Sequence, residues 1–362
     1  MRIAYFEWDE NLLQRLLQFK TLMNLFNYLL FRTGGEVKRA FRWMEELQAQ
    51  GILSEDFDLN AFKEQLEKEG LVERVSGVPK LTPKGRKRIR QDSLNEIFTS
   101  LKKSGSGNHP MPATGIGGEK LPETRPYQFG DEPTIIDFNR SIHNALLRKG
   151  LEQIQMNQED LEVHDTEHMA TCATVLLLDV SHSMILYGED RITPAKQVAM
   201  ALAELIQTQY PKDDLHVAIF GDDAVEVRVK DILKVQAGPF YTNTAAALRL
   251  ARQILERDRG INKQIFIITD GKCSAIHEGG RIYRNAWGLD PKIVNKTLRE
   301  ASLCRKKKIP ITTFMVAEDP YLVKFVERLT KVNQGRAYYA PAGTLGSYLF
   351  VDYIRNRRKH LH

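Results

Sequence analysis

The sequence has little cysteine, and the few cysteines it has are far apart. Among its 362 residues only three are cysteines, namely Cys172, Cys273 and Cys304. Their number is odd and they form no Cys-x-x-Cys pair, which argues against a disulfide framework and against a cysteine-rich zinc site. We therefore expect three reduced, buried thiols.

Long apolar runs are also missing from the sequence. No stretch approaches the roughly eighteen apolar residues of a membrane-spanning helix, and the N-terminus lacks the basic and then apolar pattern of a signal peptide. The glycines around Gly117 are not followed by Lys-Ser or Lys-Thr, so they do not form a phosphate-binding P-loop. We expect a cytoplasmic protein without a membrane span, in which any ATP hydrolysis belongs to a partner.

Charge of one sign does not dominate the chain. It has 52 Lys and Arg against 46 Asp and Glu, which gives a net charge of +6. An excess of this size is too small to predict nucleic-acid binding by itself. The apolar fraction of 42% is sufficient for a packed core, and the length of the chain suggests two domains.

Residues 1–103 have the pattern of a small, mostly helical domain. Apolar residues recur at helical spacing over 11–31, 37–47 and 60–69. Residues 70–81 alternate between apolar and polar around a turn at Ser76 and Gly77, which predicts a hairpin. Thr82 and Pro83 then begin another helix. Helices followed by a small hairpin and a further helix predict a winged-helix-like domain.

A group of cations, called here the basic set, lies in the first turns of the helix that follows Thr82. The basic set consists of Lys84, Arg86, Lys87, Arg88 and Arg90. Cations are unfavourable at the positive end of the helix dipole, so other contacts must compensate for them. One interpretation is an anionic partner, either nucleic-acid phosphate or an acidic protein face, and the other is a solvated basic surface. A DNA-binding regulator is therefore one alternative function.

A glycine- and proline-rich stretch and a histidine-containing pattern lie between the N-terminal domain and the strand at 175–178. Residues 104–134 are rich in glycine and proline without periodicity, which predicts a linker before a helix at 135–151. His164, Glu167 and His168 match the H-x-x-E-H spacing of one class of zinc protease, a site that needs both histidines on one face of a helix. The preceding residues alternate as a strand does, so we favour a strand end over a zinc site.

From the apolar run at 175–178 onward, and regularly after Thr193, the pattern alternates between buried strands and helices. The four apolar residues 175–178 mark a strand covered on both faces, and similar strands are predicted at 215–220, 225–229, 264–268, 309–316 and 337–339. Helices are predicted between them. This alternation predicts an α/β fold with a doubly wound, mainly parallel sheet and helices on both faces.

Polar oxygen-bearing side chains follow two of these buried strands, and a third group begins the helix between them. The candidate ligands are Asp179, Ser181, Ser183, Thr242 and Asp270, with Thr244 as an alternative to Thr242. The carboxyl ends of parallel strands meet at one edge of a sheet, so we expect these side chains to lie together. Two carboxylates with neutral hydroxyls favour Mg²⁺ with retained waters, with Mn²⁺ or Ca²⁺ as alternatives.

This pattern resembles the metal-ion-dependent adhesion site (MIDAS) of the von Willebrand factor A (VWA) domain family. The resemblance covers about residues 173–340 within a VWA domain expected over 135–362, and it implies that all five candidates are metal ligands. The second loop departs from the family pattern, because Phe240 and Tyr241 stand where the family often has glycines. The C-terminal part, including residues 310–315 and 344–353, resembles bacterial intracellular members. These members look like partners of AAA+ ATPases of the MoxR and magnesium-chelatase type.

The function that we expect is a non-enzymatic interaction module, an adaptor or co-factor of such an AAA+ ATPase. It would bind an acidic residue of its protein partner through Mg²⁺. A Mg²⁺-dependent phosphohydrolase is a further alternative, but such enzymes need a second carboxylate two residues after the first aspartate, and this chain has Ser181 there. Residues 273–291 are long for a connection and are expected to rim the metal site.

Overall fold

The computed structural model describes most of the chain. The described residues are 22–53, 57–103, 120–127, 136–149, 156–166, 171–188, 190–258, 262–285, 289–317, 319–341 and 343–357. The chain divides into two compact units. The larger unit comprises Met1–Gly105 with Thr171–His362, and the smaller unit is Ser106–Ala170.

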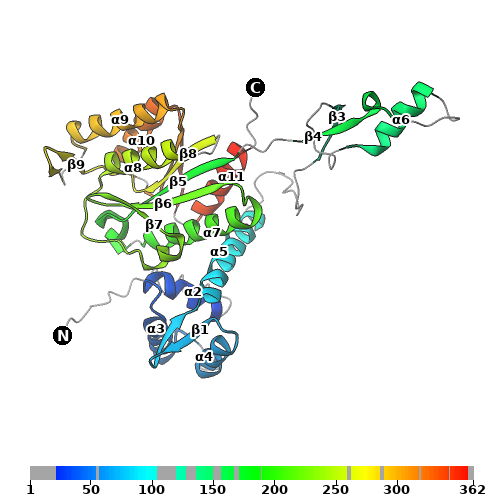
Figure 1. The fold of residues 1–362 in the computed structure, drawn as a ribbon. Helices are drawn as coiled ribbons and strands as arrows, with labels where there is room; N and C mark the ends of the chain where they lie inside the picture. The colour runs from blue at the N-terminus through cyan, green and yellow to red at the C-terminus, as the bar shows by residue number, and fades with distance from the viewer. Residues whose placement is uncertain are drawn as a thin grey trace. The chain divides into compact units, whose positions relative to one another are not determined.

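The larger unit is built on a six-stranded sheet with the strand order β12-β11-β8-β5-β6-β7 (Figure 1). Its strands are β5 (Cys172–Asp179), β6 (Asp214–Phe220), β7 (Ala224–Val227), β8 (Asn262–Thr269), β11 (Ile311–Met315) and β12 (Arg336–Tyr339). All neighbouring strands pair in parallel except β6 and β7, which are antiparallel. The predicted doubly wound, mainly parallel sheet is therefore confirmed.

Helices cover both faces of this sheet. They are α7 (Ile192–Gln209), α8 (Thr244–Arg257), α9 (Pro291–Lys306), α10 (Pro320–Asn333) and α11 (Leu345–Arg357). Figure 1 shows α8, α9 and α10 on one face and α7 and α11 on the other. The side chains of β5 alternate between these layers: Leu176 and Leu178 pack with α7 and α11, whereas Val175 and Leu177 pack with α8 and α9. An unbroken apolar run is thus buried on both faces.

The N-terminal part of the larger unit is mostly helical, as predicted. It contains α2 (Leu22–Arg32), α3 (Val37–Ala49), α4 (Leu59–Lys68), the antiparallel hairpin β1 (Val72–Val75) and β2 (Val78–Leu81), and the long helix α5 (Pro83–Lys103). Ser76 and Gly77 form the turn with positive φ angles of 52° and 78°, a conformation that suits a two-residue hairpin. The part of the predicted first helix that precedes Leu22 lies outside the described residues.

Contacts within the chain account for most of the basic set on α5. Lys84 and Arg86 each donate to a backbone carbonyl oxygen, at 2.7 and 2.9 Å, and Arg88 bonds a carboxylate one turn further along the helix at 2.9 Å. Arg90 bonds a buried carboxylate of α7, and Lys87 is exposed. These contacts provide the compensation that cations at a helix N-terminus require.

The ion pair of Arg90 joins the N-terminal part to the sheet-bearing part. Helix α5 packs along α7 (Figure 1), and Arg90 Nε lies 2.9 Å from Glu204 Oε2. The Glu204 side chain is only 2% exposed and that of Arg90 is 16% exposed. A buried carboxylate needs such a partner, because an unpaired charge in the interior is strongly destabilising. Arg90 is therefore a structural residue of the larger unit.

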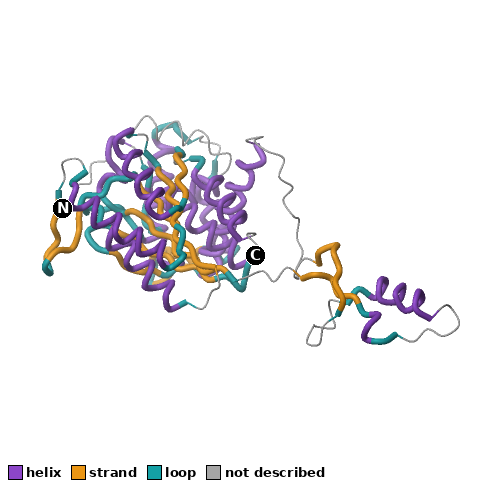
Figure 2. The backbone as a smooth tube through the Cα atoms, turned by 90° about the horizontal axis from the view of Figure 1, so that it is seen from above, coloured by secondary structure: helices purple, strands orange, loops and turns teal. Residues whose placement is uncertain are grey.

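The smaller unit contains a two-stranded antiparallel sheet of β3 (Lys120–Pro126) and β4 (Glu162–Thr166), beside α6 (Phe138–Lys149) and the short helix η2 (Gln158–Asp160), as Figure 2 shows. Strand β3 lies within residues 104–134, for which the sequence predicts a linker. Both strands of a two-stranded sheet are edge strands, which tolerate proline, so composition alone does not reveal them. His164 belongs to β4, whereas Glu167 and His168 of the H-x-x-E-H pattern lie outside the described residues.

All three cysteines are free and buried, as predicted, and burial raises the pKa of Cys273 and of Cys304 to about 12. Within the described part of the chain, no helix has both the length and the apolar character needed to cross a bilayer.

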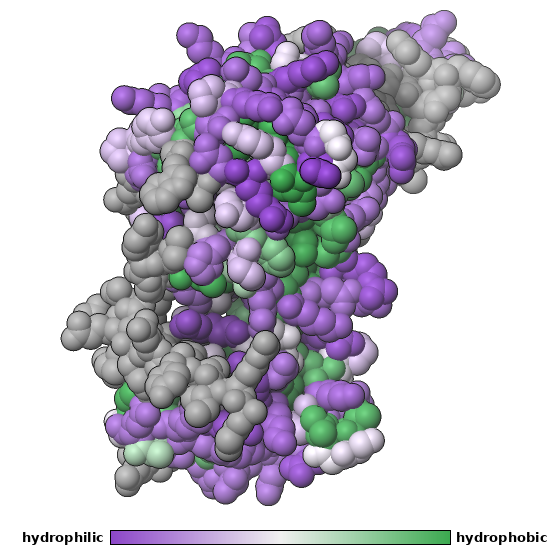
Figure 3. Space-filling model, turned by 90° about the vertical axis from the view of Figure 1, so that its left-hand side faces the viewer, coloured by the Kyte–Doolittle hydropathy of each residue, from purple (hydrophilic) through white to green (hydrophobic). Residues whose placement is uncertain are grey.

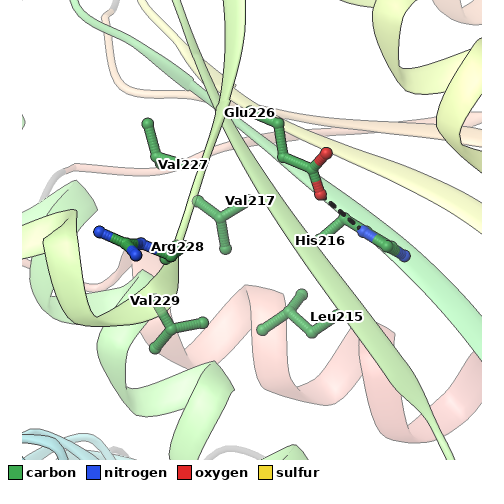
Figure 4. A pocket seen from close by; sticks show the side chains of 7 residues that line it. All are labelled: Leu215, His216, Val217, Glu226, Val227, Arg228 and Val229. Atoms are coloured by element: carbon green, nitrogen blue, oxygen red, sulfur yellow. Dashed lines mark hydrogen bonds and ion pairs between the residues drawn. The ribbon is translucent and has the colours of Figure 1, made fainter.

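A shallow pocket lies at the outer strands β6 and β7, lined by His216, Glu226, Arg228 and neighbouring valine and leucine side chains (Figure 4). His216 Nδ1 is 2.8 Å from Glu226 Oε1, and its Nε2 is 3.2 Å from Asp258 Oδ2. Burial lowers the pKa of His216, but hydrogen bonds to the two carboxylates and their charges outweigh burial and raise it. None of the lining residues belongs to the candidate ligands.

The Arg90–Glu204 pair gives a stability prediction. Arg90→Ala leaves the Glu204 carboxylate buried without its partner and is expected to lower the free energy of unfolding by about 2–3 kcal/mol. The control Lys87→Ala, an exposed residue of the same helix, should change it by less than about 0.5 kcal/mol. Urea denaturation checks both values. The double variant Arg90→Ala/Glu204→Gln should recover part of the loss. If Arg90→Ala and Lys87→Ala changed the free energy of unfolding equally, this would contradict the structural role of Arg90.

Candidate metal centre

The first loop of the candidate site follows the central strand β5. Asp179 is the last residue of β5 and is completely buried. Its Oδ1 accepts a hydrogen bond of 2.9 Å from the backbone N–H of Ser181, and Ser181 Oγ lies 3.0 Å from Ser183 Oγ. The Asp-x-Ser-x-Ser spacing thus folds into a tight turn that gathers one carboxylate and two hydroxyls at the end of the strand.

The third loop follows β8, the strand next to β5. Thr269 Oγ1 donates to Asp179 Oδ2 at 2.6 Å and accepts from the Gly271 N–H at 3.1 Å. Asp270 is 3% exposed, and its Oδ1 accepts from the Lys272 N–H at 3.0 Å. Gly271 has a φ of +88°, and a Cβ there would lie 3.1 Å from the Met315 side chain, so the turn requires glycine.

The order of the strands explains why these two loops meet. The chain runs from β5 to β6 and β7 on one side, and it then returns to place β8, β11 and β12 on the other side. The point between β5 and β8 is therefore the topological switch point, where open α/β sheets bind ligands beyond the carboxyl ends of their strands. Asp179 and Asp270 come from these two strands.

The second loop is bonded to both of the others. The backbone N–H of Thr242 donates to Ser274 Oγ at 2.9 Å, and its carbonyl oxygen accepts from the Ser274 and Ala275 N–H groups at 2.9 and 3.1 Å. The carbonyl oxygen of Phe240 accepts from the N–H of His182, in the first loop, at 3.1 Å. The three loops that the sequence places far apart therefore meet at one edge of the sheet.

The two threonine candidates occupy different positions at the start of α8. Asn243 is the helix N-cap, and its side chain accepts from the Ala246 N–H at 3.0 Å. Thr244 is consequently the first residue inside the helix, whereas Thr242 lies in the loop that is bonded to Ser274. Both threonines are buried. The loop position of Thr242, tied to the segment that follows Asp270, makes it the better candidate.

The electrostatics of the site are unusual for a protein interior. Burial is the largest cause that raises the pKa of Asp179, the charge of Asp270 raises it further, and hydrogen bonds from Ser181 and Thr269 oppose the rise; the result is a pKa of about 7. Among the residues that the structure describes, neither carboxylate forms an ion pair with Lys, Arg or His. Two neighbouring buried carboxylates without a cationic side chain need a bound proton or cation.

The donor set restricts which cation could bind. It consists of carboxylate and hydroxyl oxygens from Asp179, Ser181, Ser183, Thr242 and Asp270, which suit a hard cation that keeps some of its waters. In the described ranges no group of three or more His, Cys, Asp or Glu side chains is arranged to hold a metal. The residues therefore fit Mg²⁺, Mn²⁺ or Ca²⁺ and do not fit a structural zinc ion.

Three residues that the sequence analysis missed support the second loop. Ser274 bonds Thr242, as described above. Asp222, in the turn after β6, accepts from the Tyr241 N–H at 3.2 Å and from Arg284 Nη2 at 3.0 Å. The Arg284 guanidinium also lies 5.4 Å from the centre of the Tyr241 ring. These hydrogen bonds join residues that are 19 to 62 positions apart, so no local pattern identifies them.

Arg284 belongs to a hairpin within residues 273–291, for which the sequence predicts a long connection that rims the metal site. The hairpin consists of β9 (Ala275–Glu278) and β10 (Arg281–Arg284) and begins directly after Ser274. Its turn residues Gly279 and Gly280 both have positive φ. Figure 3 shows the molecule from the side on which β9 lies in Figure 1, and this face is mainly hydrophilic with separate apolar side chains among the polar ones.

Comparison with known proteins gives a family for the chain. Residues 172–354 match the model of the vWA domain of Rv0959-like proteins, and residues 119–166 match the third domain of the same proteins. The chain is 31% identical over 304 residues to Rv0959 of Mycobacterium tuberculosis and to Mb0984 of Mycobacterium bovis. The alignments cover 80% of this chain and 44% of each relative, so the chain spans less than half of their length.

Solved structures with partial similarity include the minor pilin PilB from Streptococcus sanguinis and the vWF domain of the pilus tip protein Mfa5 from Porphyromonas gingivalis. PilB is 14% identical with a TM-score of 0.41 over 54% of this chain and 64% of its own. The Mfa5 domain is 12% identical with a TM-score of 0.42 over 53% of this chain and 98% of its own. These overlaps are too weak to carry an argument. The family-model match, which spans about half of the chain, shows that the protein belongs to the Rv0959-like family and carries its vWA domain.

Proposed function

We propose that this chain is a metal-dependent protein-interaction module. A divalent cation, Mg²⁺ in the first place, is held by Asp179, Ser181, Ser183, Thr242 and Asp270, and an Asp or Glu side chain of a partner completes its coordination. The observation that carries the proposal is a pair of buried carboxylates to which no described residue supplies a cationic side chain, at the point where three loops are bonded together. A dication would neutralise both charges.

The chemistry of the site favours binding over catalysis. Mg²⁺ supplies a Lewis-acidic position at which one water can be exchanged for a carboxylate oxygen. Ser181 occupies the position where aspartyl-phosphate hydrolases carry their second carboxylate, and its hydroxyl is bonded to Ser183. Because Ser181 cannot act as this second carboxylate, we propose a non-enzymatic role.

The partner that we propose is an AAA+ ATPase of the MoxR or magnesium-chelatase type. This part of the proposal rests on the resemblance of the C-terminal sequence to bacterial intracellular VWA proteins. On the same ground we propose a cytoplasmic location for this chain. The DNA-binding alternative receives only partial support from the basic set. Arg88 and Arg90 are paired with carboxylates of this chain, whereas Lys84 and Arg86 donate to neutral carbonyl oxygens and keep their charge.

Metal binding is tested by its effect on thermal stability. Mg²⁺ at about one hundred times its Kd should stabilise the wild-type chain by about 2.7 kcal/mol, seen as a raised Tm in differential scanning fluorimetry. Asp270→Asn keeps an acceptor oxygen for the Lys272 N–H but removes one ligand charge, and should lose most of this response. The same assay with Mn²⁺ and with Ca²⁺ ranks the three ions by the rise in Tm that each causes. A response of Asp270→Asn equal to that of the wild type would refute the site.

The raised pKa of Asp179 gives a pH dependence. The folded, metal-free protein holds this proton up to about pH 7, whereas the unfolded chain loses it near its ordinary pKa. Protonation therefore stabilises the metal-free fold at low pH, and this contribution disappears as pH rises through 7. Below pH 7 the cation must displace the proton, so Mg²⁺ affinity should fall about tenfold per pH unit and level off above pH 7. Calorimetric titration that finds equal affinity at pH 5.5 and 8.5 would contradict this.

Partner binding is tested with immobilised full-length chain and purified MoxR-type or magnesium-chelatase-type ATPases. We expect retention in Mg²⁺ and release by EDTA, because the metal forms the bridge. The Asp179→Ala variant should not retain the ATPase, whereas Lys87→Ala, which changes an exposed cation away from the site, should behave as the wild type. Binding that persists both in chelator and in Asp179→Ala would exclude a metal bridge.

A further inference from the structure

An exposed aromatic side chain lies directly beside the candidate ligands. Phe240 is 41% exposed, although its backbone is fixed against the first loop. Its carbonyl oxygen accepts from the N–H of His182, the residue between Ser181 and Ser183, and the nearby Gly238 N–H donates to the Val180 carbonyl oxygen at 3.0 Å. Phe240 is therefore held next to the turn that supplies two of the candidate ligands.

Two glycines provide the surface on which the Phe240 side chain rests. A Cβ atom added to Gly221 would lie 2.7 Å from Phe240 Cβ, and one added to Gly238 would lie 2.4 Å from Cε2 of the ring. Any larger residue at either position would displace the ring. The ring is thus positioned by close backbone contact on one side while it faces solvent on the other.

A second exposed apolar side chain follows the first loop. Ile185, two residues after Ser183, is 42% exposed. Tyr241, the residue after Phe240, is held by the Arg284 guanidinium over its ring and by Asp222, which accepts a hydrogen bond from its backbone N–H. A rigid aromatic group loses little conformational entropy on binding, and aromatic anchors surrounded by residues that exclude water contribute most of the affinity in many interfaces.

We propose that Phe240 is a specificity-determining residue, and that the partner presents an apolar side chain within about two residues of the acidic residue that binds the cation. This inference rests on the proposed function and adds the second half of the recognition signal. The acidic group meets the dication, and the neighbouring apolar group covers Phe240. Their contact excludes water from the metal–carboxylate bond, which strengthens it because the local dielectric constant falls.

The test uses a phage-displayed library of random hexapeptides with one fixed Asp, selected on the full chain in excess Mg²⁺ and eluted with EDTA. Peptides selected by the wild type should be enriched in Phe, Leu, Ile or Met next to the Asp. A synthetic peptide of this type should bind Phe240→Ala at least about tenfold more weakly, and Phe240→Leu with a smaller loss. Val78→Ala removes a similarly exposed apolar side chain in the N-terminal hairpin and should change nothing.

The Mg²⁺-induced rise in Tm is measured on every variant and should be the same in all of them, because Phe240 is not a ligand. The inference is overturned if the eluted peptides show no apolar preference, or if the selected peptide binds Phe240→Ala as tightly as the wild type. If no peptide depends on Mg²⁺, the proposed function itself fails and this inference with it. If the peptides elute with EDTA but show no apolar preference, only this inference fails and the proposed function stands.

Discussion

The main electrostatic constraint on the larger unit is that two carboxyl groups lie close together in a buried place. Asp179 and Asp270 follow neighbouring central strands, and burial together with mutual repulsion raises the pKa of Asp179. An isolated pair of this kind is destabilising, so the surrounding contacts must hold it in place. The Thr269 hydroxyl does so directly, since it donates to Asp179 while its own position is fixed by Gly271. The same electrostatic repulsion is the reason why we propose a divalent cation at this site.

The N-terminal part packs against α7, one of the helices that cover the sheet. Lys196 of α7 is buried, and its Nζ donates to the backbone carbonyl oxygens of Phe31, Leu233 and Val235. Burial lowers the pKa of Lys196 to about 8, against the opposing charge of Asp190. One side chain thereby joins the end of α2 to the segment that leads into the second loop. The helical N-terminal part is thus a component of the larger unit, and its Arg90 is paired with a buried carboxylate of α7.

Elements in which local pattern and burial agree could be predicted from the sequence. The strand at 175–178, the helices that begin at proline or threonine, and the turn at Ser76 are all present. The structure differs at 104–134, where β3 lies within a stretch with the composition of a linker, because a two-stranded sheet tolerates the proline and charge that a central strand excludes. The hairpin β9–β10 could not be predicted, because its short strands carry little periodicity.

The sequence by itself determined the class of the fold and the identity of the candidate ligands, because apolar runs that end in Asp-x-Ser-x-Ser and Thr-Asp-Gly are local features. Only the tertiary structure decided that β8 lies beside β5, which brings Asp179 and Asp270 together. It also decided that Arg90 is paired with Glu204 and that Phe240 rests on two glycines. Such pairings depend on contacts between residues far apart in the chain, which no local pattern of residues encodes.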